Sequence, residues 1–145
     1  FLHYLKMTLG CNVLGMDVNK EVAQKSMRTL GIKILVSNIE TSSDLKDNAF
    51  DIVLMFHLLE HVESPLEVLK KTNRCLRNGG TVVIEVPDGK TEPYTPDHYH
   101  FFSKDSLKRS LESLFSDVKI FEGDYRDAAG IVRSSLRASG SKKPA

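Results

Sequence analysis

The 145-residue sequence lacks the features that mark several classes of protein. Its two cysteines, Cys11 and Cys75, lie far apart and form no CxxC pair, so neither a zinc site nor a disulfide framework is indicated. No apolar run approaches the ~20 residues that a membrane-spanning helix needs, and no secretory signal is visible. The formal net charge of +1 argues against a nucleic-acid-binding protein, whose basic excess is usually much larger.

What the sequence does contain is the composition of an ordinary globular domain. Hydrophobic residues make up 41% of the chain and charged residues 27%, and a chain of this length can bury a core. We therefore expect a single domain over residues 1–138 and a polar, frayed tail over residues 139–145. Both cysteines are expected to pack as small apolar residues in a reducing cytoplasm.

Apolar periodicity predicts alternating helices and strands along the chain. Strands are expected at residues 13–16, 32–36, 52–56, 81–86, 118–121 and 131–136. Helices are expected at residues 1–9, 20–30, 65–76 and 104–115. The last two strands are expected to form an antiparallel pair, and the order as a whole predicts an α/β domain with a mainly parallel sheet.

One predicted strand runs directly into a group of ionisable side chains. Residues 52–56 are an unbroken apolar run, which is typical of a strand buried on both faces of a parallel sheet. His57, Glu60 and His61 follow within five positions. Ligands of open α/β sheets bind beyond the carboxyl ends of the strands, so the active site is expected here.

These letters also match the inverted zincin motif H-x-x-E-H, but that motif needs both histidines on one helix. Ser64 and Pro65, followed by a glutamate at the third helical position, form a capping-box pattern that starts the helix after the motif. A loop-bound metal on His57, Glu60 or His61 lacks a fourth ligand at any telling spacing. The alternative is that these side chains bind loop backbone, which is favoured for His61.

Polar side chains close two further strands. Asp17 ends the first one, where a carboxylate can accept two hydrogen bonds from a ribose diol or act only as a turn residue. Asn38 and Glu40 follow the second strand, where an amide could recognise an adenine edge. Aspartate and asparagine are also ordinary loop residues, so neither side chain needs a ligand to explain its presence.

A loop of about sixteen residues, 87–102, is long for a compact domain and is therefore a candidate for function. It contains His98 and His100 beside aromatic residues, and a histidine can serve as a base near neutral pH. The alternative is that both histidines face solvent. Phe101 and Phe102 are expected to anchor the helix that follows.

Together, these segments resemble the class I S-adenosylmethionine-dependent methyltransferases, in the small-molecule branch of that family. The matching segments are GMDV (15–18), SNIE (37–40), FDIV (50–53), HLLEHV (57–62), LRNGG (76–80) and HFFS (100–103). The resemblance covers nearly the whole chain. It implies a Rossmann-like, mainly parallel sheet with helices on both faces and a C-terminal antiparallel strand pair.

The resemblance also implies S-adenosylmethionine as the cofactor. The residues that match its cofactor-binding positions are Asp17, Val18, Asn38, Ile39, Phe56 and His57. Asp17 would bind the ribose hydroxyls, and Asn38 stands where the family usually has an aspartate that recognises the adenine amino group. Phe56 and His57 would lie beside the methionine portion and the transferable methyl group.

Methyl transfer depends largely on positioning, and where a proton must be removed the candidate bases are His57, His61, His98 and His100. Some relatives in quinone biosynthesis carry a glutamate where His57 stands and can use a metal; the histidine here argues against a metal. The implied partner is a small-molecule substrate, with no nucleic acid and no membrane.

The sequence departs from this family at its start. The family opens with a strand and a glycine-rich loop that wraps the methionine moiety, and neither precedes Phe1 here. We therefore expect an N-terminally truncated sequence with poor cofactor binding and exposed sheet edges through which it could form a homodimer. The competing hypotheses are a non-enzymatic remnant or interaction module and, less well matched, a nicotinamide-dependent oxidoreductase.

Overall fold

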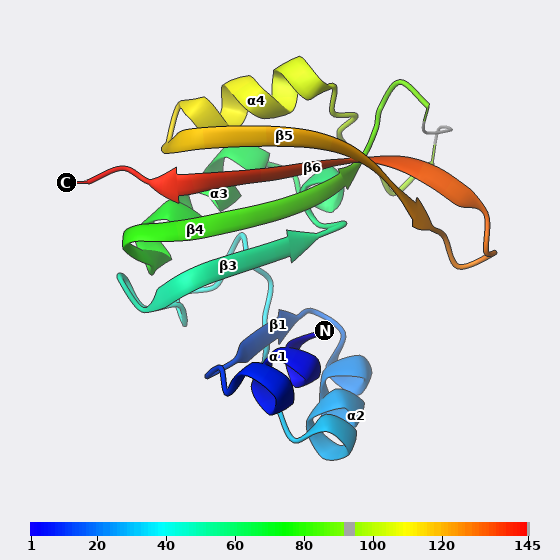
Figure 1. Cartoon of the computed structure of the whole chain (residues 1–145). Helices are drawn as coiled ribbons and strands as arrows, with labels where there is room; N and C mark the ends of the chain where they lie inside the picture. The colour runs from blue at the N-terminus through cyan, green and yellow to red at the C-terminus, as the bar shows by residue number, and fades with distance from the viewer. Residues whose placement is uncertain (92–94, 145) are drawn as a thin grey trace. The chain divides into compact units, whose positions relative to one another are not determined.

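The structure is a computed structural model that describes residues 1–91 and 95–144. Glu92, Pro93 and Tyr94, which fall in the predicted long loop, and Ala145 in the predicted tail lie outside the described residues. The chain divides into two compact units, Phe1–Asp44 and Leu45–Ala145. Each unit has its own sheet (Figure 1).

The first unit, called unit 1, contains two helices and a two-stranded parallel sheet. Its elements are α1 (Leu2–Leu9), β1 (Leu14–Asp17), α2 (Lys20–Leu30) and β2 (Lys33–Val36). Both helices end as predicted, because Gly10 and Gly31 take the left-handed conformation at φ 65° and 61°. Asn19 caps α2 by accepting hydrogen bonds from the amides of the first helical turn.

The second unit, called unit 2, contains a four-stranded sheet in the order β3-β4-β6-β5. Its elements are β3 (Phe50–Phe56), a 3-10 turn η1 (Leu59–His61), α3 (Pro65–Cys75), β4 (Leu76–Pro87), α4 (Lys104–Glu112), β5 (Phe115–Arg126) and β6 (Val132–Lys142). β3 and β4 are parallel, and β6 runs antiparallel to both of its neighbours. The C-terminal antiparallel pair is therefore confirmed.

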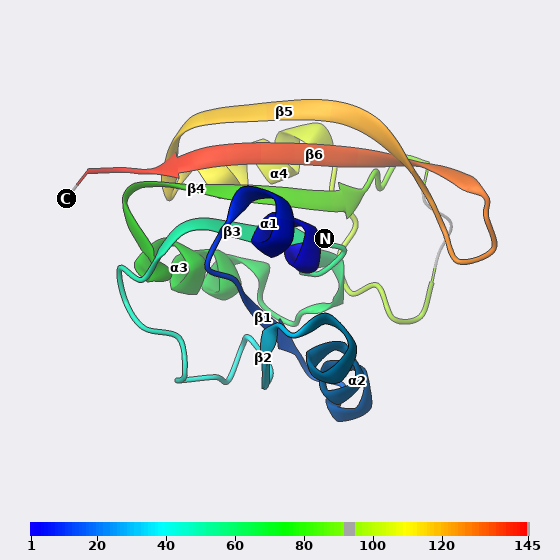
Figure 2. The ribbon, with the colours of Figure 1, turned by 60° about the horizontal axis from the view of Figure 1, so that its bottom comes forward.

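The core of unit 2 lies between its sheet and the helices α3 and α4, which cover the same face (Figure 2). Its main members, all at most 2% exposed, are Val68, Leu69, Val82, Ile84, Val86, Leu107, Leu111, Leu136 and Ala138. Fully burying a valine, leucine or isoleucine side chain contributes roughly 1.5–3 kcal/mol. This packing gives β3 and β4 a firm support from which their carboxyl ends present side chains.

Two expectations about burial are wrong. The run 52–56 is not buried on both faces, because Ile52 is 58% and Phe56 44% exposed; β3 is the edge strand of its sheet, and these side chains lie on the face opposite the helices. Cys11 is exposed, whereas Cys75 is buried as expected, and burial raises the pKa of its thiol.

The predicted tail is also wrong for residues 139–142, which continue β6. Ser139 pairs with Val83 of β4 and with Lys119 of β5. Strand pairing uses the backbone, so polar side chains do not prevent it. Gly140 is buried, and a Cβ there would lie only 2.9 Å from Cβ of Phe115.

The parallel β1–β2 and β3–β4 pairs, with a reversed β6, define a Rossmann-like α/β fold, as expected. The assignment of residues 1–138 to a single domain stays a prediction. Among the described residues, no helix combines the length and apolar character that crossing a membrane requires.

Candidate functional site

In unit 1, two of the predicted cofactor-binding segments meet at the carboxyl end of the sheet. β1 and β2 end together, with Asp17 paired to Val36 and the amide of Ser37 donating to the carbonyl oxygen of Asp17 at 3.1 Å. Asp17 and the turn that contains Asn38 therefore share one edge of the sheet. This is the edge at which open α/β sheets bind ligands.

The side chains at this edge also hold their own turns. Oδ1 of Asp17 accepts the amide of Asn19 at 2.8 Å, and an ionised carboxylate has further acceptor positions on both oxygens. Oδ1 of Asn38 accepts the amide of Glu40 at 2.7 Å, which leaves the side-chain NH2 as a donor. Val18 beside them is 69% exposed. The turn and ligand-binding interpretations of Asp17 and Asn38 are thus compatible.

In unit 2, His57 stands at the carboxyl end of β3 in a left-handed backbone conformation, with φ 49°. A non-glycine residue rarely adopts this conformation, and such strain is often found at functional sites. Nδ1 of His57 lies 3.3 Å from Oε1 of Glu60, and Nε2 lies 4.0 Å from Oε1 of Glu85. The imidazole ring also contacts Tyr125, with ring centroids 4.4 Å apart.

Glu60 is the most deeply buried acidic side chain of this group, at 1% exposure. Neither carboxylate oxygen has a hydrogen-bond partner among the described residues, which is costly for a buried charge. Its backbone carbonyl accepts the amides of Tyr99 at 2.8 Å and His100 at 3.3 Å. Glu60 therefore ties the 3-10 turn to the part of the long loop before α4.

The other predicted histidines separate into two groups. Nδ1 of His61 lies 2.9 Å from the carbonyl oxygen of Asp97, and its ring meets that of His98 edge-on at 4.7 Å. His61 thus binds loop backbone, as the alternative interpretation expected. Nε2 of His100 lies 3.2 Å from the carbonyl oxygen of Glu63. The structure accordingly gathers the side chains of His57, His61 and His98 near that of Glu60, whereas the side chain of His100 contacts Glu63.

Sequence reasoning missed two neighbours of His57. Glu85 lies on β4, and its side chain is only 14% exposed. Its Oε2 accepts a hydrogen bond from Nε of Arg137 at 3.0 Å. Tyr125 comes from β5, far away in the sequence. An ionisable residue inside the apolar run of β4 was a visible signal for Glu85, but no local pattern singles out Tyr125.

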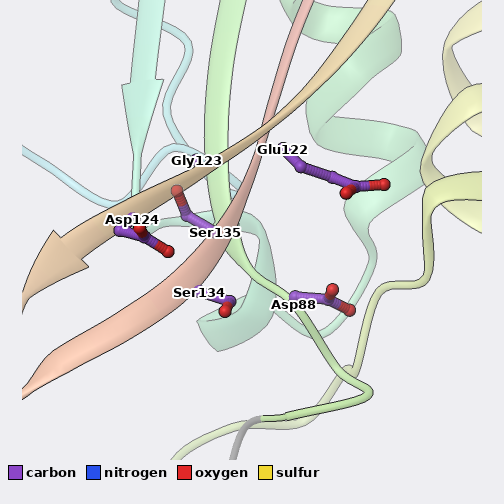
Figure 3. Close-up of a pocket in the computed structure, with 6 residues that line it drawn as sticks. All are labelled: Asp88, Glu122, Gly123, Asp124, Ser134 and Ser135. Carbon is purple, nitrogen blue, oxygen red and sulfur yellow. The ribbon is translucent and has the colours of Figure 1, made fainter.

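A cavity of about 260 Å³ lies elsewhere in unit 2 (Figure 3). Its lining residues are Asp88, Glu122, Gly123, Asp124, Ser134 and Ser135. The side chain of Glu122 lies 3.3 Å from Nζ of Lys104. None of the predicted site residues lines this cavity.

The strand order and the helices of the two units define an α/β protein of the Rossmann-like type. The sequence matches the model of the methyltransferase domain family over residues 1–84, and the chain belongs to that family. This segment includes Asp17, Asn38, His57 and Glu60.

Relatives and solved structures agree with this family. The chain is 28% identical over 90 residues to the ubiquinone biosynthesis O-methyltransferase of Vibrio cholerae, covering 59% of this chain and 37% of that protein. It is 33% identical over 75 residues to an uncharacterized protein of Methanocaldococcus jannaschii, covering 52% of this chain and 36% of the relative. The chain thus spans little more than a third of the length of either relative.

The fold is similar to that of solved methyltransferases. One is a SAM-dependent methyltransferase of Thermotoga maritima, described as a possible histamine N-methyltransferase, with a TM-score of 0.75, 20% identity and coverage of 95% of this chain and 76% of that one. Another is a SAM-dependent methyltransferase of Archaeoglobus fulgidus, with a TM-score of 0.77, 20% identity and coverage of 95% and 79%. At this identity the likeness concerns the fold.

Proposed function

We propose that the protein takes part in the transfer of a methyl group from S-adenosylmethionine to a small-molecule acceptor. The observation that carries this proposal is the family match over residues 1–84, because it contains both the Asp17 and the His57 segments. The named relatives include an O-methyltransferase and a possible N-methyltransferase, both of which suit small acceptors. Because one relative methylates oxygen and the other is described as methylating nitrogen, they do not indicate which atom of the acceptor is methylated here.

The polar groups at the edge of unit 1 suit the adenosine part of this cofactor. The second oxygen of the Asp17 carboxylate can accept a hydrogen bond from a ribose hydroxyl, and such a charge-assisted bond contributes about 1.5–3 kcal/mol. Asn38 retains a side-chain NH2 donor that can meet an adenine acceptor. The exposed side chain of Val18, together with Ile39, offers apolar contact to the ring.

Phe56 and His57 are proposed to lie at the methyl end. When bound, S-adenosylmethionine would supply an electrophilic methyl carbon on a sulfonium. An acceptor lone pair would bond to that carbon while the carbon–sulfur bond breaks and S-adenosylhomocysteine leaves. Holding the acceptor in line with that bond is the main task of the protein. Where the acceptor loses a proton, His57 is the first candidate to accept it, because Glu60 and Glu85 lie on either side of its ring. His61, His98 and His100 are the remaining candidates.

Binding of S-adenosylhomocysteine, followed by amide chemical shifts of the isotopically labelled chain, tests the cofactor assignment and detects weak binding. We expect saturable shifts at residues 15–18, 37–40 and 55–58. Asp17→Asn should weaken binding by about tenfold or more, because 1.4 kcal/mol is a factor of ten. Glu21→Gln removes one negative charge from the exposed first turn of α2 and should leave the affinity unchanged.

The absence of saturable shifts would support the alternative of an interaction module without cofactor binding. If Asp17→Asn and the parent chain bind S-adenosylhomocysteine with equal affinity, Asp17 does not bind the ribose hydroxyls. His57→Ala should bind the ligand with little change, yet lower methyl transfer to any acceptor that is found. His3→Ala, at a surface histidine of unit 1, is the control for that variant.

We also propose that the chain can self-associate through β3. This strand pairs with β4 on one side and has no strand partner on its other side among the described residues. Unpaired edges favour pairing between chains. Ile52, at 58% exposure, would be covered in such a pair.

A further inference from the structure

We propose that Glu60, His61 and His98 form a site for a divalent transition metal ion such as zinc. One ligand atom from each of the three side chains lies within 4.8 Å of the other two. Two histidines and a carboxylate are a ligand set that zinc uses in proteins, with the remaining coordination position left to water or another ligand. The site goes beyond the proposed methyl transfer and does not depend on it.

Glu60 is a buried acidic residue that needs a positive charge or a proton beside it. Its side chain is 1% exposed and neither oxygen has a hydrogen-bond partner among the described residues. A carboxylate in that position requires a compensating positive charge or a proton. Nδ1 of His57 approaches Oε1 at 3.3 Å, but two carboxylate oxygens offer more acceptor sites than one ring can satisfy.

The ring of His61 is oriented with Nδ1 toward a backbone carbonyl and Nε2 toward Glu60. Nδ1 lies 2.9 Å from the carbonyl oxygen of Asp97, which can only accept, so Nδ1 carries the hydrogen. In the neutral ring the lone pair then sits on Nε2, which lies 4.0 Å from Oε1 of Glu60. Two acceptors that face each other without a proton repel, whereas a metal ion between them binds both. A backbone carbonyl that receives the other ring N–H is the usual outer partner of a metal-bound histidine.

Backbone hydrogen bonds of the neighbouring loop residues place His98 beside His61. The carbonyl of Glu60 accepts the amides of Tyr99 and His100, the two residues that follow His98. These bonds hold the loop against the 3-10 turn and bring the ring of His98 to 4.7 Å from that of His61. Two nitrogen ligands favour zinc and its neighbours over magnesium or calcium, which prefer oxygen.

The proposed site differs from the expectation that this region binds no metal, which rested on the lack of a further ligand near His57, Glu60 and His61 and on the histidine at position 57. That ligand comes from the long loop, since positions 61 and 98 are 37 residues apart in the sequence. No spacing rule for metal motifs reaches that far without knowledge of the fold.

The test uses the full chain without a purification tag and with Cys11→Ser, because Cys11 is an exposed thiol that can bind metals by itself. Calorimetric titration with zinc chloride is expected to show one equivalent bound. His61→Ala and His98→Ala should each weaken binding by more than the roughly 10–100-fold that loss of an outer partner costs. His100→Ala, in the same loop but outside the site, should retain the parental affinity.

Cobalt(II) distinguishes ligation from a merely structural role of the loop. The parent protein should give the visible absorption of tetrahedral cobalt(II), and His98→Cys should keep it and add a thiolate-to-cobalt charge-transfer band. A parent protein that takes up no zinc would overturn the proposal. Equal zinc binding by His98→Ala, equal losses in His98→Ala and His100→Ala, or no new band in His98→Cys would overturn it as well.

Discussion

The two units of this chain differ sharply in how much each one buries. In unit 2, a four-stranded sheet packs against α3 and α4 around a continuous apolar core. In unit 1, Ala23 and Ile32 are the buried apolar residues among those described, and α1 contributes none. Phe1 and Met7 of unit 1 are 69% and 68% exposed.

Because of this difference, the two sets of candidate site residues are held in place by cores of unequal size. His57 and Glu60 extend from strands and turns that a large core holds in place. Asp17 and Asn38 extend from a two-stranded sheet, and a small unit of this kind is marginally stable by itself. Positioning at the histidine end is therefore expected to be the more robust of the two.

The largest expected effect comes from removing core volume in unit 2. Leu69→Ala, at a fully buried position of α3, should lower the free energy of unfolding by about 2–5 kcal/mol. Leu9→Ala, at a position of α1 that is 63% exposed, should change it by no more than about 0.5 kcal/mol. Urea denaturation measures both. If both variants lost the same free energy of unfolding, the difference in burial between the two units would not determine stability.

Amide hydrogen exchange of the unmodified chain compares the local stability of the two units without a mutation. Amides in the β4–β6 ladder should exchange only with global unfolding, because the core of unit 2 must open to release them. Amides in the β1–β2 pair should exchange through local opening and be much less protected. Equal protection in the two ladders would show that unit 1 is as firmly held as unit 2.

Some of this arrangement was accessible from the sequence because it is local. Asn19 as a cap and Gly10 and Gly31 as helix ends depend only on neighbouring residues, and all three were predicted correctly. Ser64 and Pro65 do begin α3, but Ser64 makes no capping hydrogen bond with its side chain. The capping box forms instead at Ser103, whose partner Ser106 does not fit the usual pattern.

Features that depend on distant contacts were not accessible. The last two strands are longer than their apolar runs, because β6 lies between β4 and β5 and pairs with both through its backbone. The gathering of His98 with Glu60 depends on hydrogen bonds across the fold. Hydrophobic periodicity carries no signal for either feature.

A smaller effect is expected at the free edge of unit 2. Ile52→Lys should weaken self-association through β3 by roughly tenfold or more, because burying an isoleucine contributes about 1.5–3 kcal/mol and a buried charge opposes it. Val22→Lys, at a position of α2 that is 49% exposed, is the matched change in unit 1. Sedimentation equilibrium measures both. Self-association that responds to Val22→Lys alone would place the contact elsewhere.

The smallest effect is expected at the β5–β6 hairpin of unit 2. The amide of Ile131 and the guanidinium of Arg133 bind the Asp127 carboxylate and hold its pKa below the ordinary value. A lowered pKa in the folded state stabilises the hairpin above the pKa of the unfolded chain, and this contribution is lost as the pH falls through the folded pKa. Chemical shifts of residues 126–132 should follow that loss. In Asp127→Asn the same chemical shifts should no longer change as the pH falls through the pKa of the Asp127 carboxyl in the parent chain.

The central proposal is that the segment around Asp17 and the segment around His57 each take part in binding S-adenosylmethionine. Ultraviolet cross-linking with cofactor that carries a tritiated methyl group, followed by peptide mapping, tests the claim most directly. We predict label in peptides that contain residues 54–58, and loss of that label with excess S-adenosylhomocysteine or with Asp17→Asn. Label confined to other peptides, or label that neither the competitor nor the substitution reduces, would contradict the account.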